Sequence, residues 1–216
     1  MEAQQKYKKE QKQKTLLQFL NEKKQALSKT DKSKKATIDK AIMPLVNLIN
    51  KSKFFYTTSS CSGRVILMKE SGKKQPNAIL FSSHEKLNEK IIIEQLKKIE
   101  SENKNAIPIY FKYEPPILHV ITFNSDYAAK LVETARQSGF KKSGFYYGKR
   151  QFPIIEIRGS EEIILPIFLK VSLIDKKYIK ILVKETNKKI WQSRQKLERL
   201  MKNLKLLLNQ EAKIRN

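Results

Sequence analysis

One short stretch of the chain, residues 54–64, combines residue types that suit the binding of a polar ligand. It passes from aromatic and β-branched residues into a run of small ones and ends on a cation, Arg64, before the apolar run 65–68. This order predicts a strand, a tight polar turn and a second strand. Hydroxyl groups, exposed backbone N–H groups and a guanidinium are donors that suit an anion. The stretch is therefore a candidate binding loop, and a serine-rich hairpin turn closed by Gly63 is the alternative.

Four residues of this loop, Ser60, Ser62, Gly63 and Arg64, are predicted to contact a carboxylate or a phosphate, because neutral donors and a guanidinium bind such groups well. Cys61 lies among them. A phosphatase-type loop needs a wider spacing between its cysteine and its arginine than the two residues that separate Cys61 from Arg64. We therefore predict that Cys61 is a small packed residue beneath the loop and not a nucleophile.

The candidates for acid–base chemistry are two histidines and one aspartate. His119 lies in an apolar run, 117–123, that predicts a strand, and an imidazole there can accept a proton at neutral pH; a half-buried histidine bonded to a neighbouring carbonyl is the alternative. His84 is predicted at the start of a helix. Asp39 is a second candidate, and a place in the first turn of a helix, where the helix dipole favours an acid, is its alternative.

The composition bounds the classes of partner. The chain has 216 residues and carries 45 Lys and Arg against 21 Asp and Glu, a formal net charge of +24. Such an excess attracts polyanions such as RNA, DNA or an anionic membrane. No apolar run approaches the roughly 20 residues of a membrane span, and the N-terminus lacks the apolar region of a signal peptide. We therefore expect a cytoplasmic protein without a membrane partner. One cysteine and two histidines give no repeated spacing for structural zinc, so no metal is predicted.

Strands and helices alternate irregularly along the chain. This pattern predicts an α+β fold with a mixed, mainly antiparallel sheet, flanking helices and a long C-terminal helix from about Asp175. No G-x-G-x-x-G follows a strand and no phosphate-loop motif exists, which argues against a Rossmann fold. We divide the chain into a basic helical extension (1–27), an α+β domain (28–186) and a basic C-terminal helix (187–216). The lysine-rich terminal helices are expected to be solvated.

Three local predictions concern the ends of elements. Segments 108–113 and 117–123 are predicted to pair as strands. The link 114–116 is excluded from the ladder, because its prolines donate no hydrogen bond. Residues 82–85 are predicted to cap a helix that extends to about residue 100. Pro44 lies within a helical pattern and predicts either a kink or a later helix start.

Several blocks of the sequence, taken in order, resemble the successive motifs of the wybutosine-synthesizing protein 3 family. The blocks lie at 31–39, 58–64, 83–85, 111–120 and 138–144, and the resemblance extends to about Asn187. It implies an S-adenosylmethionine-dependent methyltransferase with an α+β fold distinct from the Rossmann methyltransferases. The implied reaction is methylation of N4 of 7-aminocarboxypropyl-demethylwyosine, the tricyclic guanosine derivative beside the anticodon of phenylalanine tRNA.

The resemblance implies roles for the candidate residues. The cofactor is S-adenosylmethionine, the loop 60–64 contacts it, and His119 with Asp39 carries the proton chemistry. The partner is the anticodon loop of tRNA-Phe. The expected substrate contacts are cations that track phosphate and rings that bind a base: Lys32, Lys35, His84, Lys142 and Tyr147. A non-catalytic RNA-binding or ribosome-associated assembly protein is the second hypothesis. It explains the charge but not the ordered blocks of small uncharged residues.

Overall fold

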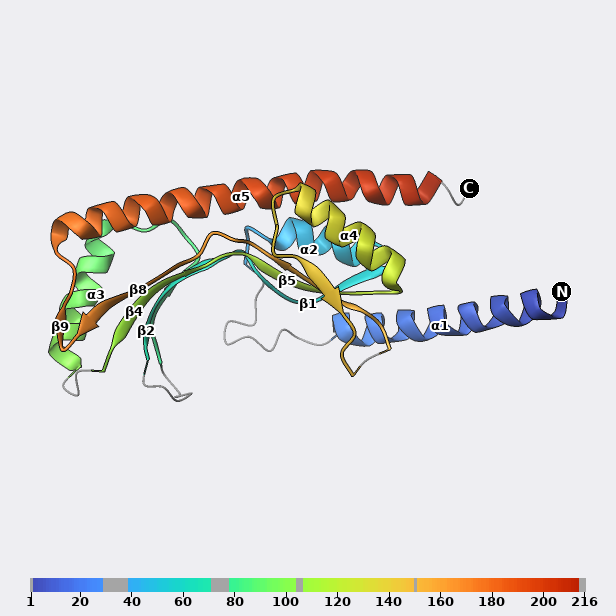
Figure 1. Cartoon of the computed structure of the whole chain (residues 1–216), viewed down its shortest axis with the longest axis horizontal. Helices are drawn as coiled ribbons and strands as arrows, with labels where there is room; N and C mark the ends of the chain where they lie inside the picture. Colours follow the sequence, from blue (N-terminus) through green and yellow to red (C-terminus); the bar gives the residue numbers. More distant parts are fainter. Residues whose placement is uncertain (1, 29–38, 71–77, 104–106, 150, 214–216) are drawn as a thin grey trace.

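The structure is a computed structural model that describes residues 2–28, 39–70, 78–103, 107–149 and 151–213. Its centre is an arched layer of β-strands, with the longest helix lying along the outer side of the arch (Figure 1). The predicted α+β fold with mainly antiparallel strands, flanking helices and a long C-terminal helix is confirmed, and the strands form two antiparallel sheets where one mixed sheet was predicted. No helix within these ranges combines the length and the apolar character needed to cross a membrane.

The strands of the described residues form two antiparallel sheets. Sheet A has the strand order β1-β5-β7-β6, and sheet B has the order β3-β2-β4-β8-β9. The bounds are β1 Phe55–Cys61, β2 Arg64–Lys69, β3 Ile79–Ser83, β4 Ile109–Glu114, β5 Ile117–Thr122, β6 Gly144–Tyr146, β7 Ile154–Arg158, β8 Ile163–Leu169 and β9 Val171–Ser172.

Three segments of the chain cross from one sheet into the other, and together they form the bend of the arch. They are β1 with β2, β4 with β5, and β7 with β8, and within each pair the two strands belong to different sheets. The predicted pairing of 108–113 with 117–123 is therefore wrong, and so is the hairpin alternative for residues 54–64. Pro115 and Pro116 have no N–H to give to a ladder, and here they interrupt the ladder at the bend instead of closing a turn.

Glycines permit close approach of the chain at this bend. Gly63 has φ +92°, a backbone conformation that residues other than glycine rarely adopt. A Cβ at Gly159 would lie 2.8 Å from Cβ of Pro115 on the neighbouring segment. Because a real Cβ cannot approach so closely, residue 159 must be glycine for the segments to cross in this way.

The helices cover the sheets on their convex side, except for α1. Helix α3 packs on sheet B, while α2 and α4 pack on sheet A; α1 lies beneath the other face of sheet A (Figure 1). The bounds are α1 Glu2–Ser28, α2 Met43–Lys51, α3 Glu89–Glu102, α4 Ser125–Gln137 and α5 Lys176–Lys213. Pro44 lies in the first turn of α2, so the later helix start is the observed one.

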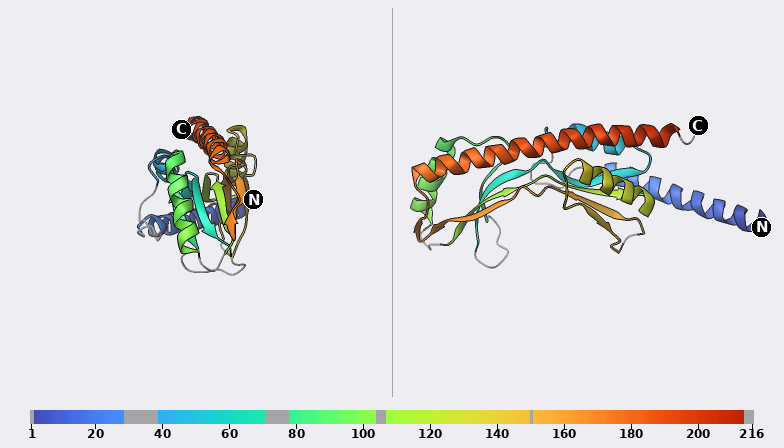
Figure 2. Two further views of the ribbon diagram at one scale, coloured as in Figure 1. Left: turned by 90° about the vertical axis from the view of Figure 1, so that its left-hand side faces the viewer. Right: turned by 45° about the horizontal axis from the view of Figure 1, so that its top comes forward.

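Helix α5 packs against both sheets and runs along the whole arch (Figure 2). It has 38 residues, or about 57 Å at 1.5 Å per residue. Its first half buries Ile179, Leu182, Val183 and Ile190 in the core of sheet B, and its second half buries Leu197, Leu200 and Leu204 in the core of sheet A. The helix continues unbroken through residue 187, and its apolar seam is packed, not solvated as expected.

The N-terminal helix is also packed at its second half. Phe19 is fully buried, and its ring centroid lies 5.5 Å from that of Tyr56 and 5.1 Å from that of Phe152. The expectation of a solvated N-terminal extension is therefore wrong around Phe19. The exposed residues of α1, such as Tyr7 and Leu17, agree with it.

Two helix starts differ from the sequence prediction. Ser82 and Ser83 belong to β3, and Asn88 caps α3 by accepting a hydrogen bond from the backbone N–H of Lys90. The predicted cap at 82–85 is therefore wrong. Ser82, Ser83 and Asn88 are all residue types that can cap a helix N-terminus. The two serines cannot cap α3, because they pair with β2 as part of strand β3.

A buried ion pair joins α5 to the bend. Lys196 of α5 binds Glu161, which lies in the link between β7 and β8, and both side chains are largely buried. Burial raises the pKa of the Glu161 carboxyl, but the hydrogen bond and positive charge of Lys196 outweigh it and hold that pKa below its usual range. Nearby, the Tyr113 hydroxyl donates to Oγ of Ser193 at 2.9 Å. Sheet B and the bend are thus tied to one helix.

Replacing Lys196 tests this tie. Lys196→Met leaves the Glu161 carboxylate buried without its cation, so we expect the free energy of unfolding at pH 7 to fall by about 3 kcal/mol in urea titrations. The low pKa of Glu161 means that its contribution is present at neutral pH and is lost as the pH falls below the ordinary value of 4.5. The difference in the free energy of unfolding between the variant and the wild type should therefore become smaller in acid. Lys202→Met, at an exposed position of α5, is the control. An equally large loss of unfolding free energy in Lys202→Met would contradict a specific role for the Lys196–Glu161 ion pair.

Candidate functional site

The end of β1 lies in a cluster of polar groups from three segments of the chain. The Asp39 carboxylate oxygen Oδ2 accepts hydrogen bonds from the backbone N–H of Ser62 at 3.0 Å and from its hydroxyl at 3.2 Å. Nδ1 of His84, which follows β3, lies 3.1 Å from the same oxygen and 2.9 Å from the carbonyl oxygen of Gly63. Because a carbonyl only accepts, Nδ1 of His84 carries a hydrogen.

Local backbone geometry positions the acid of this cluster. The carbonyl of Asp39 accepts the N–H groups of Ile42 and Met43, each at 3.1 Å, in the turn that leads into α2. Asp39 therefore precedes the helix, and the alternative that it lies in the first helical turn is wrong. Its side chain is instead directed to Ser62. The carboxylate and the imidazole of His84 are largely buried, with exposed side-chain fractions of 17% and 20%.

Cys61 lies against this cluster. Its Sγ is 3.9 Å from Nδ1 of His84, and burial raises the pKa of the thiol to about 11. The thiol is therefore protonated at neutral pH, which agrees with a packed residue and not with a nucleophile. Ligand atoms of Asp39, Cys61 and His84 lie within 4.8 Å of one another, and each of them already has a polar neighbour in the cluster. The absence of a metal stays a prediction.

Arg64 begins the strand on the far side of the bend. Its Nε lies 2.6 Å from Oε2 of Glu114, the residue opposite it on β4. The Arg64 side chain is 35% exposed. A guanidinium has five N–H donors, and this ion pair uses the one on Nε. Arg64 is thus held at the cluster by one carboxylate, in a position where its other donors are available to an anion.

His119 lies on β5, between β1 and β7, and makes side-chain contacts with both. Its Nδ1 is 2.8 Å from Oγ of Ser59, and its Nε2 is 3.1 Å from Oε2 of Glu156. The alternative that the ring bonds a neighbouring carbonyl is therefore wrong. Sequence reasoning missed Ser59 and Glu156 as partners of this ring. The only sequence signal was an acid within the apolar strand pattern 154–157, and its meaning depends on the strand order.

The remaining predicted residues lie apart from these contacts. Ser60 is opposite Leu118, and its side chain points to the other face of the sheet from those of Ser59 and Cys61. Lys142 and Tyr147 are exposed beside β6, which is separated from β1 by β5 and β7, or about 14 Å at the usual strand spacing. Lys32 and Lys35 lie outside the described residues. The structure thus brings together Asp39, Ser62, Gly63 and His84. Arg64 follows directly at the start of β2, and His119 lies on β5, the strand beside β1.

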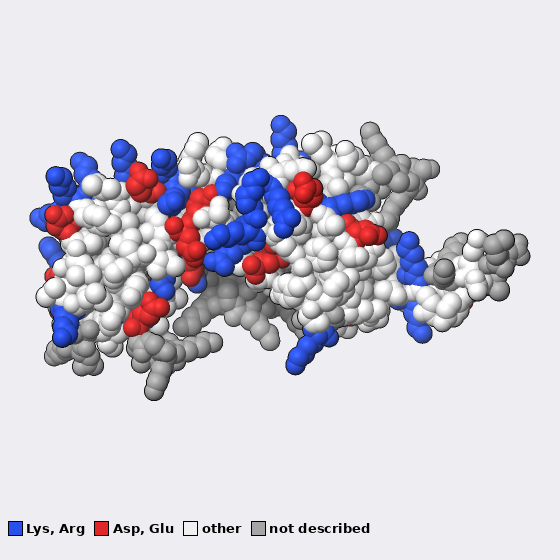
Figure 3. Space-filling model, viewed as in Figure 1, with Lys and Arg blue, Asp and Glu red and all other residues white. Residues whose placement is uncertain are grey.

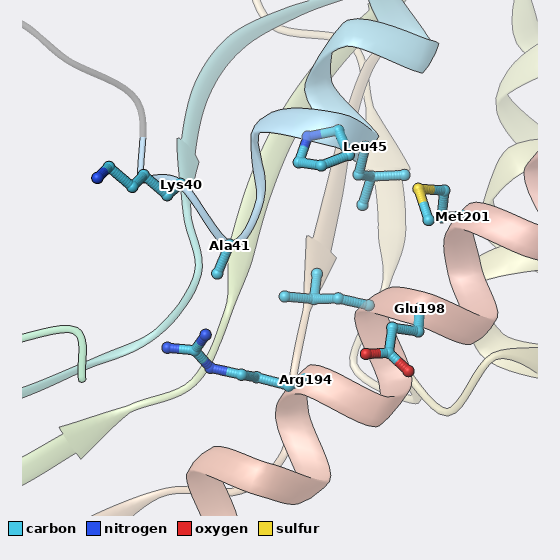
Figure 4. A pocket seen from close by; sticks show the side chains of 8 residues that line it. Lys40, Ala41, Leu45, Arg194, Glu198 and Met201 are labelled. Carbon is cyan, nitrogen blue, oxygen red and sulfur yellow. The ribbon is translucent and has the colours of Figure 1, made fainter. Parts of the chain in front are cut away.

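A cavity opens between α2 and α5, next to the cluster. Its volume is about 340 Å³, within the range of small-molecule sites. Figure 4 shows the side chains around it: Lys40, Ala41, Pro44, Leu45, Arg194, Leu197, Glu198 and Met201. Arg194 also donates to the backbone carbonyl of His84 at 3.0 Å, and Lys40 follows Asp39 in the chain. No local pattern in the sequence predicts this cavity, because its two walls are about 150 residues apart in the chain.

A family comparison identifies the chain. The family model described as Methyltransferase TYW3 matches residues 10–206. The chain belongs to the TYW3 methyltransferase family. The resemblance inferred from the ordered sequence blocks is thus confirmed, and so is the prediction of an enzyme.

Curated relatives match this TYW3 chain over most of its length. The tRNA wybutosine-synthesizing protein 3 homolog of Bos taurus is 32% identical over 201 residues, which cover 90% of this chain and 76% of the relative. A Pyrococcus abyssi protein is 34% identical over 177 residues, covering 81% and 83% of the two chains. It is named tRNA(Phe) 7-((3-amino-3-carboxypropyl)-4-demethylwyosine(37)-N(4))-methyltransferase 2. The TYW3 family thus places this methyltransferase in tRNA wybutosine synthesis.

A solved structure shares the TYW3 chain's fold. The PH1069 protein from Pyrococcus horikoshii superposes with a TM-score of 0.77 at 28% identity, covering 88% of this chain and 97% of that one. The arched sheets and the long helix are therefore a known arrangement.

The raised pKa of Cys61 gives a test of the cluster in this TYW3 chain. Because the thiol ionises only near pH 11, its alkylation by iodoacetamide should be slow at pH 7 and should rise about tenfold per pH unit up to pH 10. Mass spectrometry measures the rate, and Cys61→Ser, which removes the only cysteine, is the blank. A rate that levels off below pH 9 would contradict this environment for the thiol.

Proposed function

We propose that this TYW3 methyltransferase transfers the methyl group of S-adenosylmethionine to N4 of 7-aminocarboxypropyl-demethylwyosine beside the anticodon of tRNA-Phe. The observation that carries the proposal is the family match over residues 10–206, together with the Pyrococcus abyssi relative that is named for this reaction. The convergence of three separate segments at the end of β1 supports it independently: Asp39, the link Ser62–Gly63 and His84 are more than 20 residues apart in sequence.

The residues around β1 and the cavity fit the chemistry of the cofactor. S-Adenosylmethionine supplies an electrophilic methyl group on a sulfonium and carries an amino-acid end with both an ammonium and a carboxylate. The cavity offers charges of both signs, from Lys40, Arg194 and Glu198, and Arg64 offers further donors for a carboxylate. Gly63 is buried at the bend, and its carbonyl oxygen holds the imidazole of His84 beside Asp39. Ser62 acts through Asp39, which it holds in place by two hydrogen bonds.

Methyl transfer to nitrogen requires that the nitrogen lose a proton. His119 is the proposed proton acceptor, because its imidazole lies on β5, the strand next to β1, and imidazole nitrogens can accept protons. Asp39 is the second candidate, and its carboxylate also accepts a hydrogen bond from Ser62 and contacts Nδ1 of His84. The chain's further task is to orient the two reactants, since one in-line displacement needs no covalent enzyme intermediate.

The charge of the molecule supports a tRNA substrate. Lys and Arg side chains gather over the middle of the face drawn in Figure 3, across α5 and the bend, with acidic groups around them. A cationic surface of this kind binds phosphate without reading sequence. The anticodon loop then has to present its modified base to the site, as RNA loops do when unstacked bases are recognised. Lys32, Lys35, His84, Lys142 and Tyr147 are the proposed substrate contacts.

The decisive experiment supplies labelled S-adenosylmethionine and tRNA from cells arrested before this methylation. We expect one methyl group per tRNA-Phe, in a nucleoside whose mass and fragmentation place the methyl on N4. Transfer RNA lacking the aminocarboxypropyl group is the matched control and should accept far less. No transfer, with tRNA binding intact and no affinity for S-adenosylmethionine, would favour the assembly-protein hypothesis instead.

The ion pair at the bend gives a sharper test of cofactor binding. Arg64→Ala should weaken binding of S-adenosylmethionine or tRNA by about tenfold in calorimetric titrations, since a charge-assisted hydrogen bond contributes roughly 1.5–3 kcal/mol. Glu114→Gln removes the carboxylate partner but keeps the guanidinium, so its affinities should stay close to those of the wild type. Equal losses in both variants would show that the pair is only structural and would remove Arg64 from the site.

A further inference from the structure

We propose that the hydroxyl of Ser59 is the group that contacts the methyl-accepting nitrogen, that it passes the proton on to His119, and that Glu156 fixes the histidine in the receptive tautomer. This inference rests on the proposed function and names a residue that the reaction uses. It starts from a row of three side chains on neighbouring strands: Ser59 on β1, His119 on β5 and Glu156 on β7.

The hydrogen-bond partners determine which nitrogen of His119 carries the hydrogen. A carboxylate can only accept, so the contact of Nε2 with Oε2 of Glu156 at 3.1 Å requires hydrogen on Nε2. In the neutral ring Nδ1 is then an acceptor. The Ser59 hydroxyl, 2.8 Å away, must therefore donate to it.

This arrangement leaves the histidine no direct access to a substrate proton. Both ring nitrogens have partners within the protein, and only 28% of the side chain is exposed. Ser59 is exposed, and its oxygen has lone pairs besides the O–H that it donates. A proton from outside therefore reaches Nδ1 through the oxygen of Ser59.

The register of the sheet places this row between two others on the same face. On one side lie Tyr56 and Ile121, which pack under Phe19 of α1. On the other side lies Cys61 opposite Ile117, next to the cluster of Asp39 and His84. Ser59 and Cys61 are two residues apart on one strand face, or about 7 Å. The polar row thus lies between a closed aromatic core and the proposed cofactor site.

A β-bulge directs Ser59 to this face. The register shifts between Thr57 and Ser59, so Thr57 lies opposite Val120 and Ser59 lies opposite His119 with one extra residue between them. Without the bulge, strict alternation would turn Ser59 to the side of the helices. Bulges often redirect side chains next to active sites.

The proton transfer balances with the methyl transfer. The N4–H bond breaks as its proton moves to Oγ of Ser59, while the Ser59 proton moves to Nδ1 of His119. The electron pair left on N4 forms the new N–CH3 bond, and the S–CH3 bond breaks with its electrons returning to sulfur. The serine ends neutral and the imidazolium is stabilised by the carboxylate of Glu156. The proton then leaves to solvent.

A purely structural role for the row predicts different behaviour. Hydrogen bonds among three strands would stabilise sheet A, and their loss would lower stability without a specific effect on the methyl-transfer step. Two measurements distinguish the proton-transfer role from a structural role. One is the single-turnover rate at saturating S-adenosylmethionine and tRNA, and the other is the tautomer of the His119 ring.

The kinetic test uses Ser59→Ala, Ser59→Thr and the control Thr58→Ala. Thr58 is the exposed neighbour whose hydroxyl contacts the backbone carbonyl of His119 and not its ring. We expect Ser59→Ala to slow the transfer step about 100-fold with both binding affinities within twofold of wild type, and Ser59→Thr to restore most of the rate. Thr58→Ala should stay within threefold. A Ser59→Ala rate close to that of the wild type would overturn the proposal while leaving the proposed function standing.

The spectroscopic test does not depend on activity. The chain has two histidines, so long-range ¹H–¹⁵N spectra contain two ring systems, and His84→Gln identifies the one from His119. We expect hydrogen on Nε2 and a bare Nδ1 in the neutral ring, and a mixture of tautomers in Glu156→Leu. Hydrogen on Nδ1 in the wild type would overturn the proposal. A wild type with the expected tautomer but no methyl transfer would show that the proposed function has failed, and the inference with it.

Discussion

The bend in the β-layer is the constraint on which the rest of the structure depends. Three segments cross it, and each has a residue there that tolerates close approach or breaks the ladder: Gly63, Pro115 with Pro116, and Gly159. A bent sheet alone would leave two half-cores exposed, so one helix has to cover both sides of the bend. Helix α5 does so, and the ion pair of Lys196 with Glu161 fixes it at the crossing point. Removing either partner would leave an uncompensated buried charge at this point.

The site is a consequence of the same bend. Where β1 ends, the chain passes through Ser62 and Gly63 into the other sheet, and the backbone groups released from the ladder become available to other partners. Asp39 binds Ser62, and His84 contacts both Asp39 and the carbonyl of Gly63. A turn within one flat sheet would have paired β1 with β2 and left no room for these contacts. The proposed cofactor site and the cavity beside α2 therefore exist because the two sheets diverge at this point.

Two kinds of polar arrangement share strand β1. At its end the groups hold one another in a largely buried cluster, and this burial raises the pKa of the Cys61 thiol. Two residues earlier on the same face of β1, Ser59 is exposed and its hydroxyl contacts one ring nitrogen of His119. The other ring nitrogen contacts Glu156. The first arrangement suits the binding and orientation of a ligand, and the second suits the movement of a proton. Their spacing along a single strand face allows both to act on one pair of reactants.

The sequence by itself determined the family of the protein and several of its local features. The small-residue loop ending at Arg64, the charge of +24, the missing nucleotide fingerprints and the apolar seam of the last helix depend only on local composition and spacing, so they could be read directly. Only the tertiary structure decided which strands pair, because the runs before and after Pro115 are equally compatible with a hairpin and with a crossing of two sheets. Strand order then determined the partners of His119: Glu156 is far away in sequence and reaches the ring only because β5 lies beside β7. Pairing is set by burial of both cores at once, a property of the whole chain that no local pattern contains.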